Sequence, residues 1–242
     1  MSRGLDEGTR KLLREVSTAT ITTVLFKRGL RNVFLGGLAP LGTGALPMVG
    51  EAYTLRNIPA REDIDTIDAL GRTDHPQRRA IEDTPPGHVL VIDARGELRG
   101  ATGGGILMAR LMVRGVAGMV TDGGVRDAAE IGALAMPVYC QRPVAPLNLV
   151  VHHAVEANVP IGCAGVPVYP GDVMVGDTDG VVCIPRHLAA EVAAEGWEQE
   201  RKERFVTLKI RAGAPLFGTY PPSVETTVEY QAWLRRGAPG AL

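Results

Sequence analysis

Two short motifs in the middle of this sequence combine residue types and spacings that could do chemistry. The first is Gly103–Gly105, which lies between a predicted strand and a predicted helix. Glycine lets a backbone approach a ligand closely, and free N–H groups at a helix start attract anions, so this run could bind a carboxylate. It is no nucleotide-binding loop, since no Gly-Lys-Ser/Thr follows, and no dinucleotide fingerprint, since position 108 is Met. A tight turn without a ligand is the alternative interpretation.

The second motif is the pair Arg126-Asp127, which follows a strand predicted at Val116–Asp122. Ligands of open α/β proteins gather at such strand ends. An arginine there could bind a carboxylate or a developing enolate oxygen, and an aspartate could hold a divalent cation. A single protein carboxylate suits Mg²⁺, or else Mn²⁺, better than a tightly caged zinc ion. The alternative is structural, because Asp127 and Glu130 have the spacing of a helix capping box.

Other reactive residues carry weaker signals. His152 and His153 are adjacent, so their side chains point apart, which favours a surface or subunit-contact role over a metal site. The lysines fall on polar stretches, which disfavours a Schiff-base enzyme, and no Gly-x-Ser-x-Gly elbow is present. The cysteines lie in or beside apolar strands and are interpreted as small hydrophobic residues: Cys140, Cys163 and Cys183.

The composition is that of an ordinary globular chain and excludes several classes of protein. Hydrophobic residues make up 45% and charged residues 22% of the 242 residues. The net charge of −1 argues against a nucleic-acid binder, which usually carries a basic excess. No apolar run is long enough to span a membrane, and the N-terminus is unlike a secretory signal. We therefore expect a cytoplasmic protein without a membrane or nucleic-acid partner.

The elements that must position the two motifs form an α/β pattern of alternating strands and helices. The sequence predicts a helix at Thr9–Arg28, and then, in chain order, a strand at Val49–Ile58, short helices at Arg61–Arg72 and Gln77–Asp83, a strand at His88–Asp93, a helix that Gly115 ends, the strand at Val116–Asp122, a helix at Asp127–Leu134 and a strand at Pro137–Cys140. After about residue 160 the pattern changes to short segments that predict an antiparallel meander: Val166–Tyr169, Val173–Val175 and Val181–Ile184.

The C-terminal part is predicted to be helical and polar. A charged helix is expected at His187–Lys209, and a further helix at Ser223–Arg236 with Ser223 as its N-cap. Packing against a neighbouring subunit would explain such a polar helix and the long tail that follows it.

Several blocks of the sequence resemble the RraA-like family, which includes class II 4-hydroxy-4-methyl-2-oxoglutarate aldolases, oxaloacetate decarboxylases and the regulator of ribonuclease activity. The blocks that carry this resemblance are Gly50–Thr54, Pro86–Asp93, Gly103–Leu107, Gly115–Asp127, Pro137–Tyr139, Val168–Asp172 and Asp179–Pro185. The resemblance implies an α/β fold, the family's swivelling β/β/α domain, with helical N- and C-terminal extensions. It implies one domain over residues 1–242, with a core at about 45–190 and a helical extension at 186–242, assembled as a homotrimer or a hexamer.

The resemblance also implies roles for residues of the two motifs. The substrate would be bound by backbone amides and by one arginine: Gly104, Gly105, Ile106, Leu107 and Arg126. Arg126 and Asp127 would be catalytic, and Asp127 would hold the metal. Family aldolases often have an acid where this chain has Gly105, in an Asp-X20-Arg-Asp pattern, so a carboxylate that positions water is missing here. A further carboxylate from a neighbouring subunit would be one of three: Glu198, Glu200 or Glu203.

The implied activity is a divalent-metal-dependent carbon–carbon lyase acting on a small 2-oxo acid through a metal-stabilised pyruvate enolate. Without an acid at position 105, decarboxylation is favoured over aldol cleavage, because decarboxylation needs no base. The alternative is a non-catalytic, protein-binding regulator like the regulator of ribonuclease activity. A phosphohistidine domain of the swivelling type fits less well, because His88 lies within an apolar strand.

Overall fold

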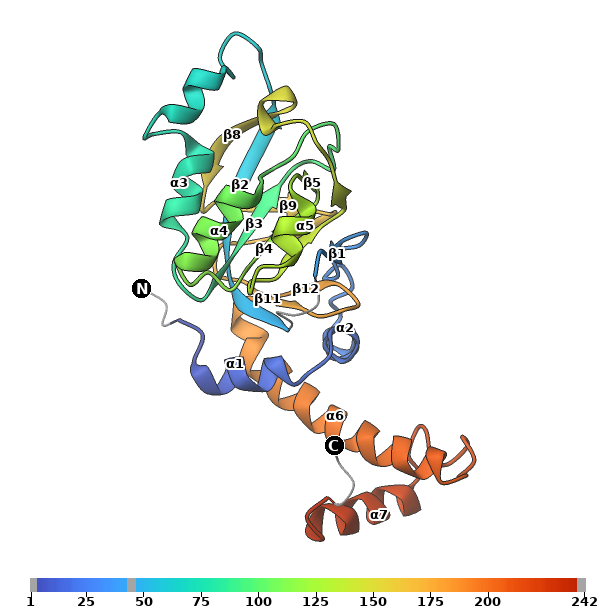
Figure 1. Ribbon diagram of the computed structural model, residues 1–242. Coiled ribbons are helices and arrows are strands. Elements are labelled where there is room, and N and C mark those ends of the chain that lie inside the picture. The colour runs from blue at the N-terminus through green and yellow to red at the C-terminus, as the bar shows by residue number, and fades with distance from the viewer. Residues whose placement is uncertain (1–3, 43–46, 239–242) are drawn as a thin grey trace.

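The computed structural model describes residues 4–42 and 47–238 of the chain, and it shows a mixed α/β fold built on one large twisted sheet (Figure 1). The ends of the predicted domain, at residues 1–3 and 239–242, and the start of its predicted core at residue 45 lie outside the described residues. The α/β fold expected from the sequence is confirmed.

The described part of the large sheet has the order β1-β6-β4-β3-β2-β11-β12, and β8 pairs with the far half of β2. Its strands, in that order, are β1 (Ala39–Pro40), β6 (Val138–Cys140), β4 (Gly118–Thr121), β3 (His88–Asp93), β2 (Met48–Pro59), β11 (Val173–Gly176), β12 (Val181–Ile184) and β8 (His152–Ala157). Strands β2, β3, β4 and β6 are parallel, whereas β1, β8, β11 and β12 join antiparallel. The parallel strands are almost wholly buried, as expected for strands that are covered on both faces.

Two layers cover the sheet. On one face pack α3 (Pro76–Asp83), α4 (Gly105–Val113) and α5 (Ala128–Gly132), whose apolar residues share a cluster with β3 and β4. On the other face lies a small hairpin of β9 (Ile161–Cys163) and β10 (Val166–Val168), which packs against Val89, Val91 and Val120. The sheet therefore presents the carboxyl ends of its parallel strands to the loops that carry both sequence motifs.

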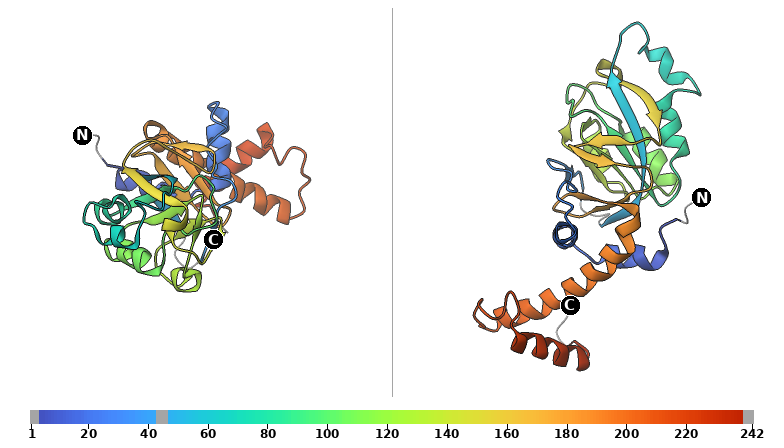
Figure 2. Two further views of the ribbon diagram at one scale, coloured as in Figure 1. Left: turned by 90° about the horizontal axis from the view of Figure 1, so that it is seen from above. Right: turned by 180° about the vertical axis from the view of Figure 1, so that it is seen from behind.

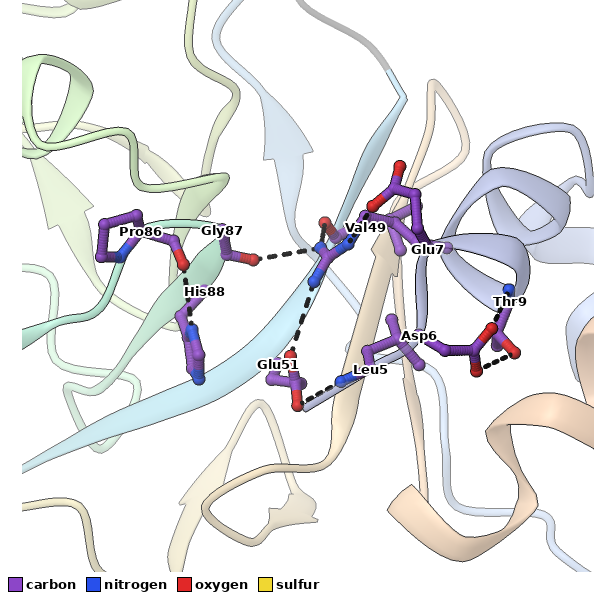
Figure 3. A network of polar contacts seen from close by, with 10 residues as sticks. Leu5, Asp6, Glu7, Thr9, Val49, Glu51, Pro86, Gly87 and His88 are labelled. Atoms are coloured by element: carbon purple, nitrogen blue, oxygen red, sulfur yellow. Dashed lines mark hydrogen bonds and ion pairs between the residues drawn. The ribbon is translucent and has the colours of Figure 1, made fainter. Parts of the chain in front are cut away.

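The N-terminal helices α1 (Glu7–Arg14) and α2 (Thr18–Lys27) pack with α6 (Ala189–Arg211) at one end of the sheet. The Arg10 side chain of α1 donates hydrogen bonds to the carbonyl oxygens of Val49 (2.9 Å) and Gly87 (3.1 Å) and lies 3.5 Å from the Glu51 carboxylate. The Glu51 carboxylate also accepts a hydrogen bond from the backbone of Leu5 (Figure 3). These contacts fix the start of β2 relative to β3.

The second half of α6 and all of α7 (Val224–Arg235) project from the body as a helical hairpin (Figures 1 and 2). The two helices are held together by their own apolar cluster: Phe205, Val206, Tyr230 and Trp233. Ser223 caps α7 as predicted, because its hydroxyl accepts a hydrogen bond from the backbone of Thr226. The hairpin is thus a local structure with little contact to the sheet.

Several predicted elements are wrong in extent or partner. The single helix predicted at Thr9–Arg28 is two helices, because Ser17 begins a new helix and its backbone N–H donates to Glu200. The segment predicted as a helix at Arg61–Arg72 contains only a short 3₁₀ turn, Ile67–Gly71. The predicted meander is divided, since β11 and β12 extend the large sheet next to β2 while β10 pairs with β9.

Candidate functional site

The glycine run forms the turn that leads into α4. Thr102 donates from its backbone to the carbonyl oxygen of Gly124 at 2.8 Å, which ties this turn to the chain leaving β4. Gly104 has extended backbone angles (φ −142°, ψ −177°) and precedes the first helical residue, Gly105. A Cβ atom on Gly104 would lie 2.6 Å from Oδ2 of Asp127 and 2.9 Å from Nε of Arg126. Gly104 therefore has to be a glycine because Arg126 and Asp127 approach it closely. A tight turn without a ligand would not require this close approach.

Arg126 and Asp127 lie directly against the glycine turn. The backbone of Arg126 donates to the carbonyl oxygen of Gly103 at 3.1 Å. Asp127 has left-handed backbone angles (φ 61°, ψ 36°), which aspartate tolerates better than most residues. Its Oδ2 atom accepts a hydrogen bond from the Gly105 N–H at 3.0 Å and lies 3.6 Å from Nε of Arg126. The two motifs predicted from the sequence are therefore one site.

The capping-box interpretation of Asp127 is wrong. Asp127 occupies the N-cap position of α5, but its carboxylate makes no capping hydrogen bond to that helix. The carboxylate turns instead toward the start of α4, where the positive end of the helix dipole stabilises a negative charge. The Asp127 side chain therefore bonds to the start of α4 and not to the start of α5.

Glu130 lies beside the same turn, although the sequence offered only the capping-box role for it. A Cβ atom built on Gly105 would lie 2.6 Å from Oε2 and 2.8 Å from Cδ of Glu130. The Glu130 carboxylate therefore fills the space into which an acidic side chain at position 105 would project. The spacing of two residues between Asp127 and Glu130 was the available signal.

A cavity of about 420 Å³ opens at this site. Its wall combines both motifs with the loop before α3 and the segment before β8: Ile67, Leu70, Gln77, Arg78, Ala101, Gly103, Gly104, Ile106, Leu107, Arg126, Asp127, Leu147 and Asn148. Arg126 and Asp127 also line a second hollow, together with Pro143–Ala145. The volume is in the range that holds a small-molecule ligand.

Three residues at the start of α4 line this cavity and carry backbone N–H donors: Gly104, Ile106 and Leu107. The Gly105 N–H is bonded to Asp127, and the Leu107 N–H donates to the carbonyl oxygen of Gly104 at 3.0 Å. The N–H groups of Gly104 and Ile106 have no hydrogen-bond partner in the described part of the chain. Of the four amides expected to bind substrate, these two are the ones free to bind an anion.

Asp127 is the carboxylate at this cavity that could hold a metal ion. Its Oδ1 atom accepts no hydrogen bond from any residue that the structure describes. Within residues 4–42 and 47–238, no group of three or more His, Cys, Asp or Glu side chains is arranged to hold a metal. A cation on Asp127 would keep most of its water molecules, which is the way Mg²⁺ usually binds to proteins. The donor set thus fits the expected Mg²⁺ and not a caged ion.

The other residues considered from the sequence lie away from the cavity or are buried. The surface or subunit-contact role predicted for His152 is wrong, because this side chain is 2% exposed within the single chain and Nε2 lies 3.3 Å from the carbonyl oxygen of Gly100. Burial lowers the pKa of His152. The neighbouring His153 points the other way, as predicted, and its Nδ1 lies 2.7 Å from the Asp65 carboxylate.

The cysteines and the C-terminal glutamates do not join the cavity within one chain. All three cysteines are buried as predicted, and burial raises the pKa of the Cys140 thiol to about 11. Glu198, Glu200 and Glu203 all lie on α6 and hydrogen-bond to Tyr230, Ser17 and Gln199, respectively.

No helix in the described ranges has the length and apolar character needed to cross a membrane.

Comparison with known proteins assigns the chain to a family. The family model described as RraA-like, Aldolase/RraA, matches residues 18–183, which is more than half of the chain. The chain therefore belongs to the RraA-like family, and the resemblance seen in its motifs is confirmed.

Relatives of the chain have names of two kinds. The 4-hydroxy-4-methyl-2-oxoglutarate aldolase of Thermus thermophilus is 34% identical over 168 residues, which are 64% of this chain and 92% of that protein. A protein of Halalkalibacterium halodurans with the provisional name of such an aldolase is 33% identical over 55% of this chain, and the match spans 65% of its own length. The solved structure of Streptomyces coelicolor RraAS2, described as an unusual member of the RNase ES inhibitor RraA protein family, is similar with a TM-score of 0.74. It is 30% identical, and the match covers 85% of this chain and 98% of that one.

Proposed function

We propose that the chain is a divalent-metal-dependent carbon–carbon lyase that cleaves a small 2-oxo acid and releases pyruvate. The observation that carries this proposal is the convergence of the Asp127 carboxylate, the Arg126 guanidinium and the start of α4 on one cavity. A carboxylate, a fixed cation and free amide donors are the groups that a 2-oxo acid and its enolate require. The names of the aldolase relatives support the same reaction class.

The backbone amides at the start of α4 and the Arg126 side chain have different roles in the proposed reaction. The free N–H groups of Gly104 and Ile106 bind the substrate's C1 carboxylate at the positive end of α4. The Arg126 guanidinium donates to the C2 oxygen, on which negative charge grows as the bond between C3 and C4 breaks. This interaction strengthens in the transition state, so it accelerates the reaction instead of only tightening binding.

Asp127 is the residue that would hold the cation, Mg²⁺ or else Mn²⁺, through its unbonded carboxylate oxygen. When bound, such a cation polarises the 2-oxo group and neutralises developing charge. The hydrogen bond from Gly105 fixes the other carboxylate oxygen, so the aspartate is oriented before any ligand arrives.

Glu130 supplies the carboxylate that position 105 lacks. Retro-aldol cleavage requires removal of the proton from the C4 hydroxyl, and decarboxylation does not. The Glu130 carboxylate lies next to Gly105 but not among the residues that line the cavity, so it would take that proton through a water molecule. With Glu130 in this role, the glycine at position 105 would be compatible with aldol cleavage as well as decarboxylation.

The test is pyruvate release from oxaloacetate by purified protein, first with EDTA and then with added Mg²⁺. We expect magnesium-dependent release above the rate of Mg²⁺ alone, and Asp127→Ala to lower it by at least about a hundredfold. Asp179→Asn is the matched control, because Asp179 is an exposed carboxylate in the turn between β11 and β12. Turnover that Asp127→Ala leaves unchanged would contradict the proposal.

A second candidate function is a protein-binding regulator without catalysis. It is favoured by the similarity to RraAS2, which spans nearly the whole of that structure. Wild-type protein without magnesium-dependent turnover that lowers the activity of a purified ribonuclease at stoichiometric amounts would support this alternative.

The projecting hairpin supports the proposal of a homo-oligomer, either a trimer or a hexamer. It exposes apolar side chains that a monomer would leave in water: Leu216, Phe217, Val224 and Val228. Light scattering tests this proposal, and a mass near that of one chain, 25.7 kDa, would contradict it.

A further inference from the structure

Arg78 is a second arginine on the wall of the cavity that contains Arg126 and Asp127. It lies in the first turn of α3. Its Nε atom is covered from solvent and has no hydrogen-bond partner in the described chain. No carboxylate among the described residues forms an ion pair with Arg78, whereas the next residue, Arg79, pairs with Asp83 at 2.8 Å. Arg78 thus presents an uncompensated positive charge to the cavity.

An unpaired, partly buried guanidinium is unfavourable unless a ligand completes it. A covered N–H donor without a partner loses its hydration and gains nothing in return. The charge of Arg78 also affects its surroundings, because burial and then this charge lower the pKa of His75. An anion bound at Arg78 would give the covered N–H group an acceptor and would balance the positive charge.

The position of Arg78 is fixed by its neighbour Gln77, which is 4% exposed. The Gln77 amide donates to the carbonyl oxygen of Thr102 at 2.7 Å and accepts from the Asn148 amide at 3.4 Å. The first turn of α3 is therefore tied to the glycine turn that contacts Asp127. This connection holds the backbone of Arg78 in place relative to Arg126 before a ligand binds.

We propose that Arg78 binds the distal carboxylate of a 2-oxo dicarboxylic acid whose 2-oxo end is held by Arg126 and the glycine turn. The inference rests on the proposed function and adds to it a residue that would select acids with a second carboxylate beyond the bond that is cleaved. One guanidinium matches the charge and the two oxygens of a carboxylate, with which it can form two parallel hydrogen bonds. Apolar residues of the same wall fit the carbon chain between the two ends: Ile67, Leu70, Leu107 and Leu147.

The test measures binding, so it does not depend on turnover. Calorimetry in the presence of Mg²⁺ compares 2-oxoglutarate with 2-oxopentanoate, which has the same chain length but a methyl group in place of the distal carboxylate. We expect the wild-type protein to bind 2-oxoglutarate at least about tenfold more tightly, as a charged hydrogen-bonded pair implies. In Arg78→Gln the two affinities should agree within about twofold, because only the 2-oxoglutarate affinity falls.

The matched control is Arg79→Gln, which removes an exposed arginine from the same helix and should retain the wild-type preference. Circular dichroism establishes that each variant is folded. Equal binding of both acids by the wild type, or an undiminished preference in Arg78→Gln, would overturn the role of Arg78 and leave the lyase proposal standing. If neither acid binds the wild type, the lyase proposal and the inference resting on it both fail.

Discussion

Replacing Glu130 by Gln separates the two reactions of which a 2-oxo acid lyase is capable. The substitution keeps the size of the side chain and removes its basic carboxylate. In the structure this carboxylate lies so close to Gly105 that a Cβ atom there would be 2.6 Å from Oε2. It therefore lies where an acid at position 105 would place its carboxylate, and we propose that it acts as the base for the C4 hydroxyl proton.

A positioned general base commonly contributes about 10²–10⁴-fold to a rate. We therefore expect Glu130→Gln to lower pyruvate release from 4-hydroxy-2-oxoglutarate by at least about a hundredfold. Pyruvate release from oxaloacetate should stay within about threefold of wild type, because decarboxylation needs no base. Chromatographic measurement of pyruvate with saturating Mg²⁺ reports both rates on the same protein sample.

The double variant Gly105→Asp, Glu130→Gln is the matched rescue. Glutamine is a flexible side chain that can move away from a new Cβ, so an aspartate at position 105 should restore part of the aldol activity. Equal loss of both reactions in Glu130→Gln would show that Glu130 supports the structure of the site instead of acting as a base. No loss of either reaction would refute the reasoning entirely.

Two further predictions concern the glycine turn and a buried histidine. Gly104→Ala should lower pyruvate release by at least about tenfold with little loss of stability, because the new Cβ would displace the Asp127 carboxylate and the Arg126 side chain. Steady-state kinetics and thermal unfolding test this prediction. Unchanged kinetics would contradict the close approach of these side chains to Gly104. Burial lowers the pKa of His152 in the folded chain. At a pH below the ordinary histidine pKa of about 6.5, the unfolded chain therefore binds a proton that the folded chain does not. The free energy of unfolding should consequently fall as the pH decreases. Urea unfolding between about pH 7 and pH 5 should show that the free energy of unfolding decreases less steeply with falling pH in His152→Leu than in the wild type. The exposed control His187→Leu should keep the wild-type dependence. The same pH dependence in His152→Leu and the wild type would contradict the role of His152.

The sheet could be predicted where periodicity is a local property of the chain. The apolar runs at His88–Asp93 and Val181–Ile184 become buried strands with the predicted bounds. Strand pairing is not local, so the sequence left open that β11 joins β2 of the large sheet. The strand at His152–Ala157 was missed because its burial depends on contacts with β2 and α3.

The site could be predicted in part for the same reason. Residue types and their position after predicted strands indicated the glycine run and the pair Arg126-Asp127. In the structure these two segments are joined by the hydrogen bond from the Gly105 N–H to the Asp127 carboxylate. The spacing identified Glu130 only as a possible capping partner and gave no sign of Arg78, because their roles at the site depend on a missing Cβ and a missing ion-pair partner. Both are properties of the space around a side chain, which one-dimensional spacing does not record.

The most direct test of the lyase proposal is a crystal structure of the protein with Mn²⁺ and oxalate, a planar analogue of the pyruvate enolate. We expect an anomalous manganese peak beside the Asp127 carboxylate, with oxalate hydrogen-bonded to Arg126 and to the free amides of Gly104 and Ile106. A cavity that stays without manganese and oxalate at saturating concentrations, or a peak remote from Asp127, would contradict the lyase proposal.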